Sequence, residues 1–138
     1  HATLAYGSAL ADPTVYCRSH YLVGPLTDTT AGKPDDDSLV GNTLWLEGSY
    51  TAPNSSEPVA FSMTTTSAYG AFNDLTSEVD HATVFQSGYA SALIRIARPR
   101  GRMFDGIDFE TDNLDDASNV VLRNLIVGSD TKIYIDGD

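Results

Sequence analysis

Acidic side chains are the residues of this chain whose types and spacing could do chemistry, because hard cations such as Ca²⁺ take several oxygen ligands. One acidic run occupies residues 35–37, and further carboxylates occur between Asp108 and Asp116 and near the end of the sequence. None of these sets follows the order of an EF-hand loop. We expect a calcium site, and its candidate ligands are Asp136, Asp138, Asp108 and Asp112. The alternative is a solvated acidic edge that discourages pairing between sheets.

A histidine begins the sequence as given. An amino-terminal histidine can bind copper through its α-amine and its imidazole, since imidazole is a common metal ligand. In this respect His1 resembles the histidine brace of secreted copper monooxygenases. The resemblance implies a copper site at His1, with His20 or His81 as the second ligand. The alternative is an incidental histidine with no metal.

Catalysis by paired carboxylates is not expected here. Glycoside hydrolysis needs two carboxyl groups about 5–9 Å apart, one with a raised pKa. Asp108 and Glu110 would share a strand face, but that face lies opposite Ile107 and Phe109 and would meet water, where a carboxyl pKa is not raised. The sequence also contains no G-x-S-x-G, phosphate-loop or H-E-x-x-H motif. We therefore expect a protein that is not an enzyme.

Aromatic side chains provide a candidate binding surface at Trp45, Tyr69 and Tyr134. Aromatic faces bind sugar rings by stacking, so the surface could recognise a polysaccharide. The same side chains could instead be covered where two copies of the protein meet. Burial of Trp45 in the core is the third alternative.

Size and charge exclude several classes of protein. The chain has 138 residues, which indicates a single domain, residues 1–138, and its one cysteine, Cys17, excludes an internal disulfide. Its 19 acidic and 8 basic residues give a net charge of −11, which argues against nucleic acid and anionic membranes as partners. No apolar run approaches the roughly 20 residues of a membrane span, so we expect no membrane insertion.

Apolar-x-apolar triplets recur in the second half of the chain with a constant step. They start at Ile94, Ile107, Val120 and Ile133, each thirteen residues after the last. Residues two apart lie on one face of a strand. The repeat therefore predicts four strands that deliver apolar side chains to one core.

Strand patterns dominate the rest of the chain as well. Residues 43–51 and 59–64 alternate apolar and polar side chains around a turn at residues 52–58, and residues 25–42 are expected to form a long loop. We expect little helix, since we recognise no sustained apolar repeat at helical spacing. The predicted fold class is all-β: an antiparallel, jelly-roll-like β-sandwich of eight to nine strands.

A short parallel β-helix in the C-terminal half is the alternative fold. Residues 119–127, Asn-Val-Val-Leu-Arg-Asn-Leu-Ile-Val, resemble a rung of the right-handed parallel β-helices of the pectin-lyase type. That resemblance implies stacked parallel strands. A thirteen-residue step is short for a three-sided rung, so the antiparallel meander is preferred.

These features favour a non-catalytic structural subunit of an extracellular filament or sheath, or of a virion surface. Abundant Ser and Thr with scarce Lys is typical of secreted or surface-assembled β-proteins, which indicates an extracellular, cell-surface or virion location. Copies of the chain would assemble through β-strand and sheet-face contacts, and residues 1–12 could be an extended strand or arm that completes a neighbour's sheet. The alternatives are a secreted carbohydrate-binding module and a copper-binding protein that uses His1.

Overall fold

The computed structural model describes residues 18–74, 91–98 and 100–136. The chain divides into two compact units. The larger unit comprises residues 20–72 and 96–131, and the other includes most of strands β5 and β6. The expectation of a single domain stays a prediction.

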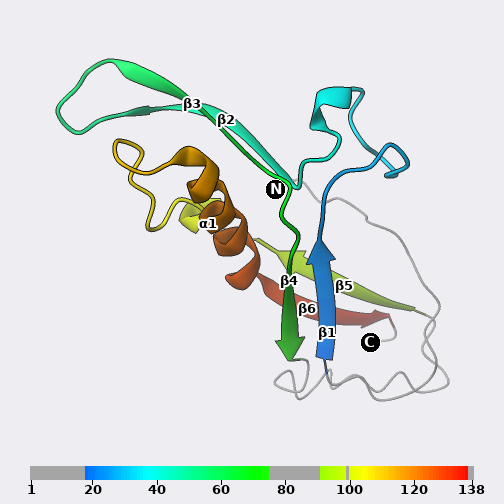
Figure 1. Cartoon of the computed structure of the whole chain (residues 1–138). Coiled ribbons are helices and arrows are strands. Elements are labelled where there is room, and N and C mark those ends of the chain that lie inside the picture. The colour runs from blue at the N-terminus through cyan, green and yellow to red at the C-terminus, as the bar shows by residue number, and fades with distance from the viewer. Residues whose placement is uncertain (1–17, 75–90, 99, 137–138) are drawn as a thin grey trace. The chain divides into compact units, whose positions relative to one another are not determined.

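The described residues form six strands, one α-helix and two short 3-10 helices (Figure 1). The strands are β1 (Arg18–Val23), β2 (Leu44–Thr51), β3 (Pro58–Thr65), β4 (Tyr69–Asp74), β5 (Ser91–Ala97) and β6 (Asp130–Asp136). The helix is α1 (Leu114–Val127), and the 3-10 helices are Asp37–Leu39 and Arg100–Arg102.

The predicted jelly-roll-like β-sandwich is wrong for the described part of the chain. Its strands pair only as β1 with β4, β2 with β3 and β5 with β6, in three two-stranded sheets. A sandwich needs two larger sheets packed face to face. Here one face of the β2–β3 hairpin packs against α1 instead.

Helix α1 occupies the segment that resembled a β-helix rung, so the parallel β-helix is wrong too. Asn113 caps the helix, because its side chain accepts a hydrogen bond from the Asp115 N–H at 2.9 Å. Asp115 and Asp116 in the first turn interact favourably with the helix dipole. One stripe of the helix is apolar or small and recurs every three or four residues: Leu114, Ala117, Ser118, Val121, Leu122, Leu125 and Ile126.

The expectation of little helix therefore fails at α1. Ala117 and Ser118 are small and interrupt the apolar repeat, while the β-branched pair Val120-Val121 favours a strand when read alone. Among the described residues, no helix is long and apolar enough to cross a membrane.

The thirteen-residue repeat is only half correct. The triplets at Ile94 and Ile133 lie in β5 and β6, which pair with each other. The triplet at Ile107 lies in an irregular segment, and the triplet at Val120 is helical. Equal spacing along the sequence therefore does not correspond to equal positions in one sheet.

The β2–β3 hairpin matches its prediction. The strands are antiparallel, with Leu46 opposite Met63, Glu47 opposite Ser62 and Gly48 opposite Phe61. Side chains directly opposite each other share a face, so the apolar positions of both strands point to the same side. The alternation predicted for residues 43–51 and 59–64 is confirmed, and the turn between them is where it was expected.

The core of the larger unit lies between this hairpin and α1. Met63, Ala117 and Val121 are buried at its centre. Partly buried side chains from the hairpin, the helix and residues 103–109 surround them: Leu44, Leu46, Phe61, Met103, Phe104, Ile107, Phe109, Leu114 and Leu125. The irregular segment that follows the second 3-10 helix is thus part of the core.

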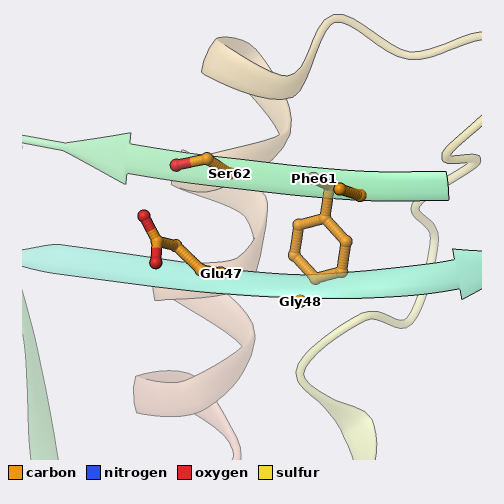
Figure 2. A pocket seen from close by; sticks show the side chains of 5 residues that line it. Glu47, Gly48, Phe61 and Ser62 are labelled. Carbon is orange, nitrogen blue, oxygen red and sulfur yellow. The ribbon is translucent and has the colours of Figure 1, made fainter.

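An aromatic cluster extends this core toward the turn of the hairpin. Phe61, Phe104 and Phe109 contact one another with ring centroids 4.9–6.0 Å apart, and Tyr50 stacks on Phe109 at 5.1 Å. The Phe61 ring also lies against Gly48, where an added Cβ would meet two ring carbons at 3.0 Å (Figure 2). The ring of Phe61 thus covers Gly48 in the facing strand. This contact stabilises the hairpin at a residue that has no side chain of its own to pack.

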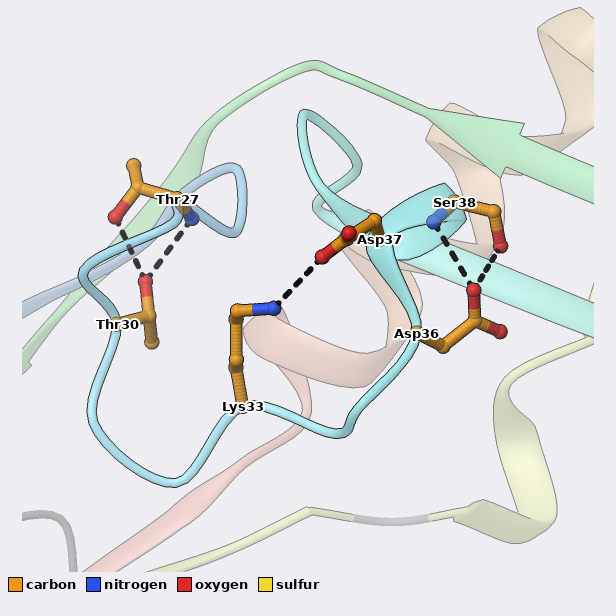
Figure 3. A network of polar contacts seen from close by, with 6 residues as sticks. All are labelled: Thr27, Thr30, Lys33, Asp36, Asp37 and Ser38. Atoms are coloured by element: carbon orange, nitrogen blue, oxygen red, sulfur yellow. Dashed lines mark hydrogen bonds and ion pairs between the residues drawn. The ribbon is translucent and has the colours of Figure 1, made fainter.

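The long loop predicted at residues 25–42 is confirmed and is ordered by local polar contacts. Backbone hydrogen bonds between Leu26 and residues 41 and 42 close its base. Within it, the Lys33 ammonium pairs with Asp37 at 3.0 Å, and the Asp36 carboxylate accepts from the N–H and hydroxyl of Ser38 (Figure 3). These contacts on Asp36, the Ser38 hydroxyl first, hold its pKa below the usual aspartate range.

Candidate functional site

Two of the four predicted calcium ligands lie close together within the described residues. Asp108 and Asp112 lie in one tight loop, but the Asp112 carboxylate accepts the Asp108 N–H at 2.8 Å, and the Asp108 carboxylate accepts the Glu110 N–H at 2.9 Å. Asp136 ends β6, and Asp138 lies outside the described residues. Within the described ranges, no three His, Cys, Asp or Glu side chains are grouped as a metal site requires. Calcium binding stays a prediction.

These loop contacts have a consequence for pH dependence. Hydrogen bonds from the Glu110 N–H and then from Thr111 hold the pKa of Asp108 below its usual value. A carboxyl group whose pKa is lower in the folded state contributes stability above its unfolded pKa, about 3.9, and loses it as pH falls through the lower, folded value.

We expect the Glu110 amide signal in an NMR titration to move with a midpoint below about 3.9, the ordinary aspartate pKa. In Asp108→Asn this acid transition should disappear, while that of the unrelated Asp36 loop remains. A midpoint at or above the ordinary value in the parent chain would contradict the hydrogen bonding described for Asp108.

Of the three histidines in the copper hypothesis, the structure describes only His20. The imidazole of His20 stacks on the ring of Phe72, with centroids 4.3 Å apart and planes inclined by 17°. His1 and His81 lie outside the described residues. Copper binding by His1 stays a prediction.

The outer face of the β1–β4 sheet is one candidate binding surface, formed by His20, Leu22, Gly70 and Phe72. Leu22 is 65% exposed and Phe72 is 72% exposed. Gly70 leaves room between the strands, because a Cβ there would lie 3.0 Å from the His20 imidazole and 3.2 Å from Leu22. Large apolar side chains that gather on one exposed face mark interaction sites more often than scattered ones do.

The opposite side of β1 is held by the helix. The Tyr21 hydroxyl donates to the carbonyl of Ile126 at 3.0 Å and also contacts the Ser129 hydroxyl. Successive residues of a strand point to opposite faces, so this anchor on Tyr21 directs His20 and Leu22 away from α1. The β1–β4 outer face is therefore a fixed feature of the larger unit.

A second candidate is a hollow between α1 and the segment that joins β3 to β4. It has a volume of about 360 Å³ and is lined by Ser67, Tyr69, Asn119, Val120, Leu122 and Arg123. We refer to it as the α1 hollow. Its volume lies at the lower end of the roughly 300–1,000 Å³ found for small-ligand sites.

The third candidate is a second hollow, of about 450 Å³, on the β2–β3 hairpin, where Glu47 and Ser62 are cross-strand partners (Figure 2). It is an open depression in the sheet. Trp45, which is 37% exposed on the polar side of the hairpin, does not line it.

The three aromatic residues of the predicted binding surface lie on different elements of the structure. Trp45 lies on β2 and Tyr69 lines the α1 hollow, and no ring contact joins them in the described part of the chain. Tyr134 lies in β6, and its side chain is outside the described set. Whether these three residues bind a partner stays a prediction.

Sequence reasoning missed most of the residues that form the two surfaces. Leu22 and Phe72 become neighbours only because β1 pairs with β4, which are nearly fifty residues apart in sequence. The predicted strand began at Val120, which placed Asn119 in the connection before it and Arg123 within it, so the two were not expected on one face. The available signal was the helical stripe of residues 114–126, which would have placed them one turn apart.

The comparisons with known proteins identify no relative. No family description matches this chain, and neither a curated protein nor a solved structure shows significant similarity to it. The candidate function therefore depends on the sequence and structure of this chain.

Proposed function

We propose that this protein is a non-catalytic structural subunit that assembles with copies of itself through the outer face of the β1–β4 sheet. The setting that we propose is an extracellular filament or sheath or a virion surface, on the basis of its Ser- and Thr-rich, Lys-poor composition. The observation that carries the proposal is the exposed group of His20, Leu22 and Phe72 on one strand pair.

The apolar character of this face supports association. Burial of apolar surface contributes about 25 cal/mol per Å², and well-packed aromatic side chains dominate the energetics of interfaces. Leu22 and Phe72 are large side chains that the larger unit leaves exposed. Covering them would stabilise a complex without a change in the fold.

The sheet geometry also supports a further layer or strand. A two-stranded sheet is marginally stable alone, and each of its strands has one unpaired edge. The β1–β4 sheet is of this kind within the described residues. A neighbouring chain could cover its outer face, extend its edge, or do both.

Charge favours a second copy at this face in particular. The chain has a net charge of −11, so copies repel one another over most of their surface. None of the four residues His20, Leu22, Gly70 and Phe72 is acidic. In a dimer with a two-fold axis, each copy would present this patch to the same patch of the other copy. These four non-acidic residues would then face one another and not acidic side chains.

The test is the size of the full chain in solution, measured by light scattering and sedimentation over a range of concentrations. We expect the parent chain to associate, and to do so more strongly at 1 M salt, where the Debye length is about 3 Å, than at 0.01 M, where it is about 30 Å. In the double variant Leu22→Ser/Phe72→Ser we expect the association constant to fall at least about tenfold, or about 1.4 kcal/mol.

Val127→Ser is the matched control, because Val127 is 64% exposed but lies at the end of α1, outside the proposed interface. It should associate like the parent chain. Circular dichroism would establish that all variants remain folded. A parent chain that stays monomeric at millimolar concentration, or a double variant that assembles normally, would refute the proposal.

A further inference from the structure

We infer that the α1 hollow is a binding site for a pyranose ring of a neutral saccharide. This site is separate from the β1–β4 outer face and does not depend on self-assembly. Three observations carry the inference: the mixed lining of the hollow, the fixed orientation of Asn119, and the guanidinium of Arg123, which has no partner among the residues that the structure describes.

The lining combines apolar and polar residues. Val120, Leu122 and the ring of Tyr69 contribute the apolar part, and Ser67, Asn119 and Arg123 contribute the polar part. A pyranose has the same division, because its axial C–H groups form an apolar face and its hydroxyls lie around the edge. Aromatic rings bind such C–H faces, and hydroxyls need donors and acceptors of the kind in this lining.

The orientation of Asn119 is set by its neighbours. The Thr65 hydroxyl, on a residue that is only 8% exposed, accepts the Ser67 N–H at 3.1 Å and donates to Asn119 Oδ1 at 2.8 Å. Both the Ser67 backbone and the Asn119 amide are therefore held by one buried hydroxyl. With Oδ1 occupied, the Nδ2 group of Asn119 is available to donate, and a site whose donors are already oriented loses less entropy when it binds.

Arg123 adds the strongest hydrogen-bond donor of the lining. It lies one helical turn after Asn119, so both side chains belong to the same helix face. Its guanidinium has no hydrogen-bond or ion-pair partner within the ranges that the structure describes. A planar group with five N–H donors can bond two adjacent hydroxyls of a sugar in parallel.

Charge decides between a neutral and an acidic sugar. One arginine alone would also suit a carboxylate, and no described carboxylate lines the hollow. The net charge of −11, however, repels an acidic polysaccharide, which carries many successive negative charges. A neutral saccharide uses the same donors without this repulsion.

The test is an NMR titration of the full chain with neutral hexasaccharides of glucose, mannose, galactose and N-acetylglucosamine, and with a hexauronate. At least one neutral hexasaccharide should shift the signals of Ser67, Tyr69, Asn119 and Arg123 Nε. Tyr69→Ala should weaken that binding about tenfold through loss of ring stacking. Arg123→Gln should weaken it severalfold, whereas Tyr69→Phe, which keeps the ring, should bind nearly as well as the parent chain.

Arg102→Gln is the matched control, because Arg102 is an exposed arginine of the larger unit that does not line the hollow. Its binding should be unchanged. Flat titrations with all neutral saccharides, or shifts centred on Trp45 instead of the hollow, would overturn the inference. Binding of the hexauronate alone would overturn the neutral class and indicate a carboxylate ligand. None of these results depends on the oligomeric state of the chain, so failure here and failure of self-assembly are distinguishable.

Discussion

Phe109→Ala is expected to lower the free energy of unfolding by about 2–3 kcal/mol, somewhat less than the roughly 3–5 kcal/mol lost when a fully buried phenylalanine is truncated. Phe109 contacts the rings of Tyr50, Phe61 and Phe104 at once and lies against the buried core of the hairpin and α1. Its removal would leave a gap among rings that come from three separate segments. Chemical denaturation of dilute protein, where association is negligible, measures the change.

The control for this prediction is Phe72→Ala, the same truncation at a residue that is 72% exposed. It removes only the stack on His20 and should cost less than about 1 kcal/mol, since a surface aromatic pair contributes about that much. The comparison tests whether residues 107–109 are a core segment. Equal losses for the two variants would mean that Phe109 does not pack as described.

Gly70→Ala, which adds one methyl group, is expected to destabilise the β1–β4 sheet strongly. A Cβ at this position would lie 2.7 Å from the carbonyl oxygen of Tyr21. Side chains such as His20 and Leu22 can turn away, but the carbonyl belongs to the backbone of β1 and moves only with the strand. Overpacking of this kind costs about 1–3 kcal/mol.

We therefore expect Gly70→Ala to reduce stability by about 2 kcal/mol and to increase hydrogen exchange at the amides of β1. It should also weaken self-association, because the β1–β4 outer face would be displaced. Gly24→Ala is the matched control: no atom lies within 4 Å of its added Cβ, and the loss of chain flexibility should leave stability unchanged or slightly higher. A Gly70→Ala protein as stable as the parent, with normal exchange, would contradict the close approach of the two strands.

The β2–β3 hairpin could be predicted because its signals are local. Alternation of apolar and polar residues on both strands excludes every register that is shifted by one residue, and the Pro- and Ser-rich turn between them limits the remaining choices. Leu46 and Met63 meet in that register, and the structure confirms it. The long loop before the hairpin was predictable for the same reason, since its Gly, Pro and Asp residues disfavour regular structure wherever they stand.

The same local reasoning could not distinguish a helix from a strand at residues 114–127. Val120-Val121-Leu122 satisfies the period of a strand, and the helical stripe becomes apparent only when Ser118 and Ala117 are counted as interior positions. Ser118 can be buried because its hydroxyl donates a hydrogen bond to the Asp115 carbonyl at 2.6 Å. Propensity favoured the wrong element, and packing against Met63 together with the Asn113 cap outweighed it.

Several of the acidic side chains that could bind a cation instead form hydrogen bonds within their own loops. Asp108, Asp112 and Asp36 accept backbone N–H groups within their own loops and so shape the chain. A run of acidic residues in sequence does not show which oxygens remain available for a cation. That depends on the loop conformation, which hydrogen bonds of only a few residues decide.

The amino-acid sequence alone was sufficient to predict the hairpin, its buried face and the long loop, because each follows from the pattern of neighbouring residues. It was also sufficient to predict the acidic character of the chain, which follows from the total charge. Tertiary structure alone decided that residues 114–127 are helical, that Phe72 lies on His20, and that Asn119 lies beside Ser67 and Arg123. Phe72 and His20, Asn119 and Ser67, and α1 and Met63 are each about fifty or more residues apart in sequence. The free energy of these arrangements comes from burial and from hydrogen bonds between such distant segments, and no local propensity encodes it.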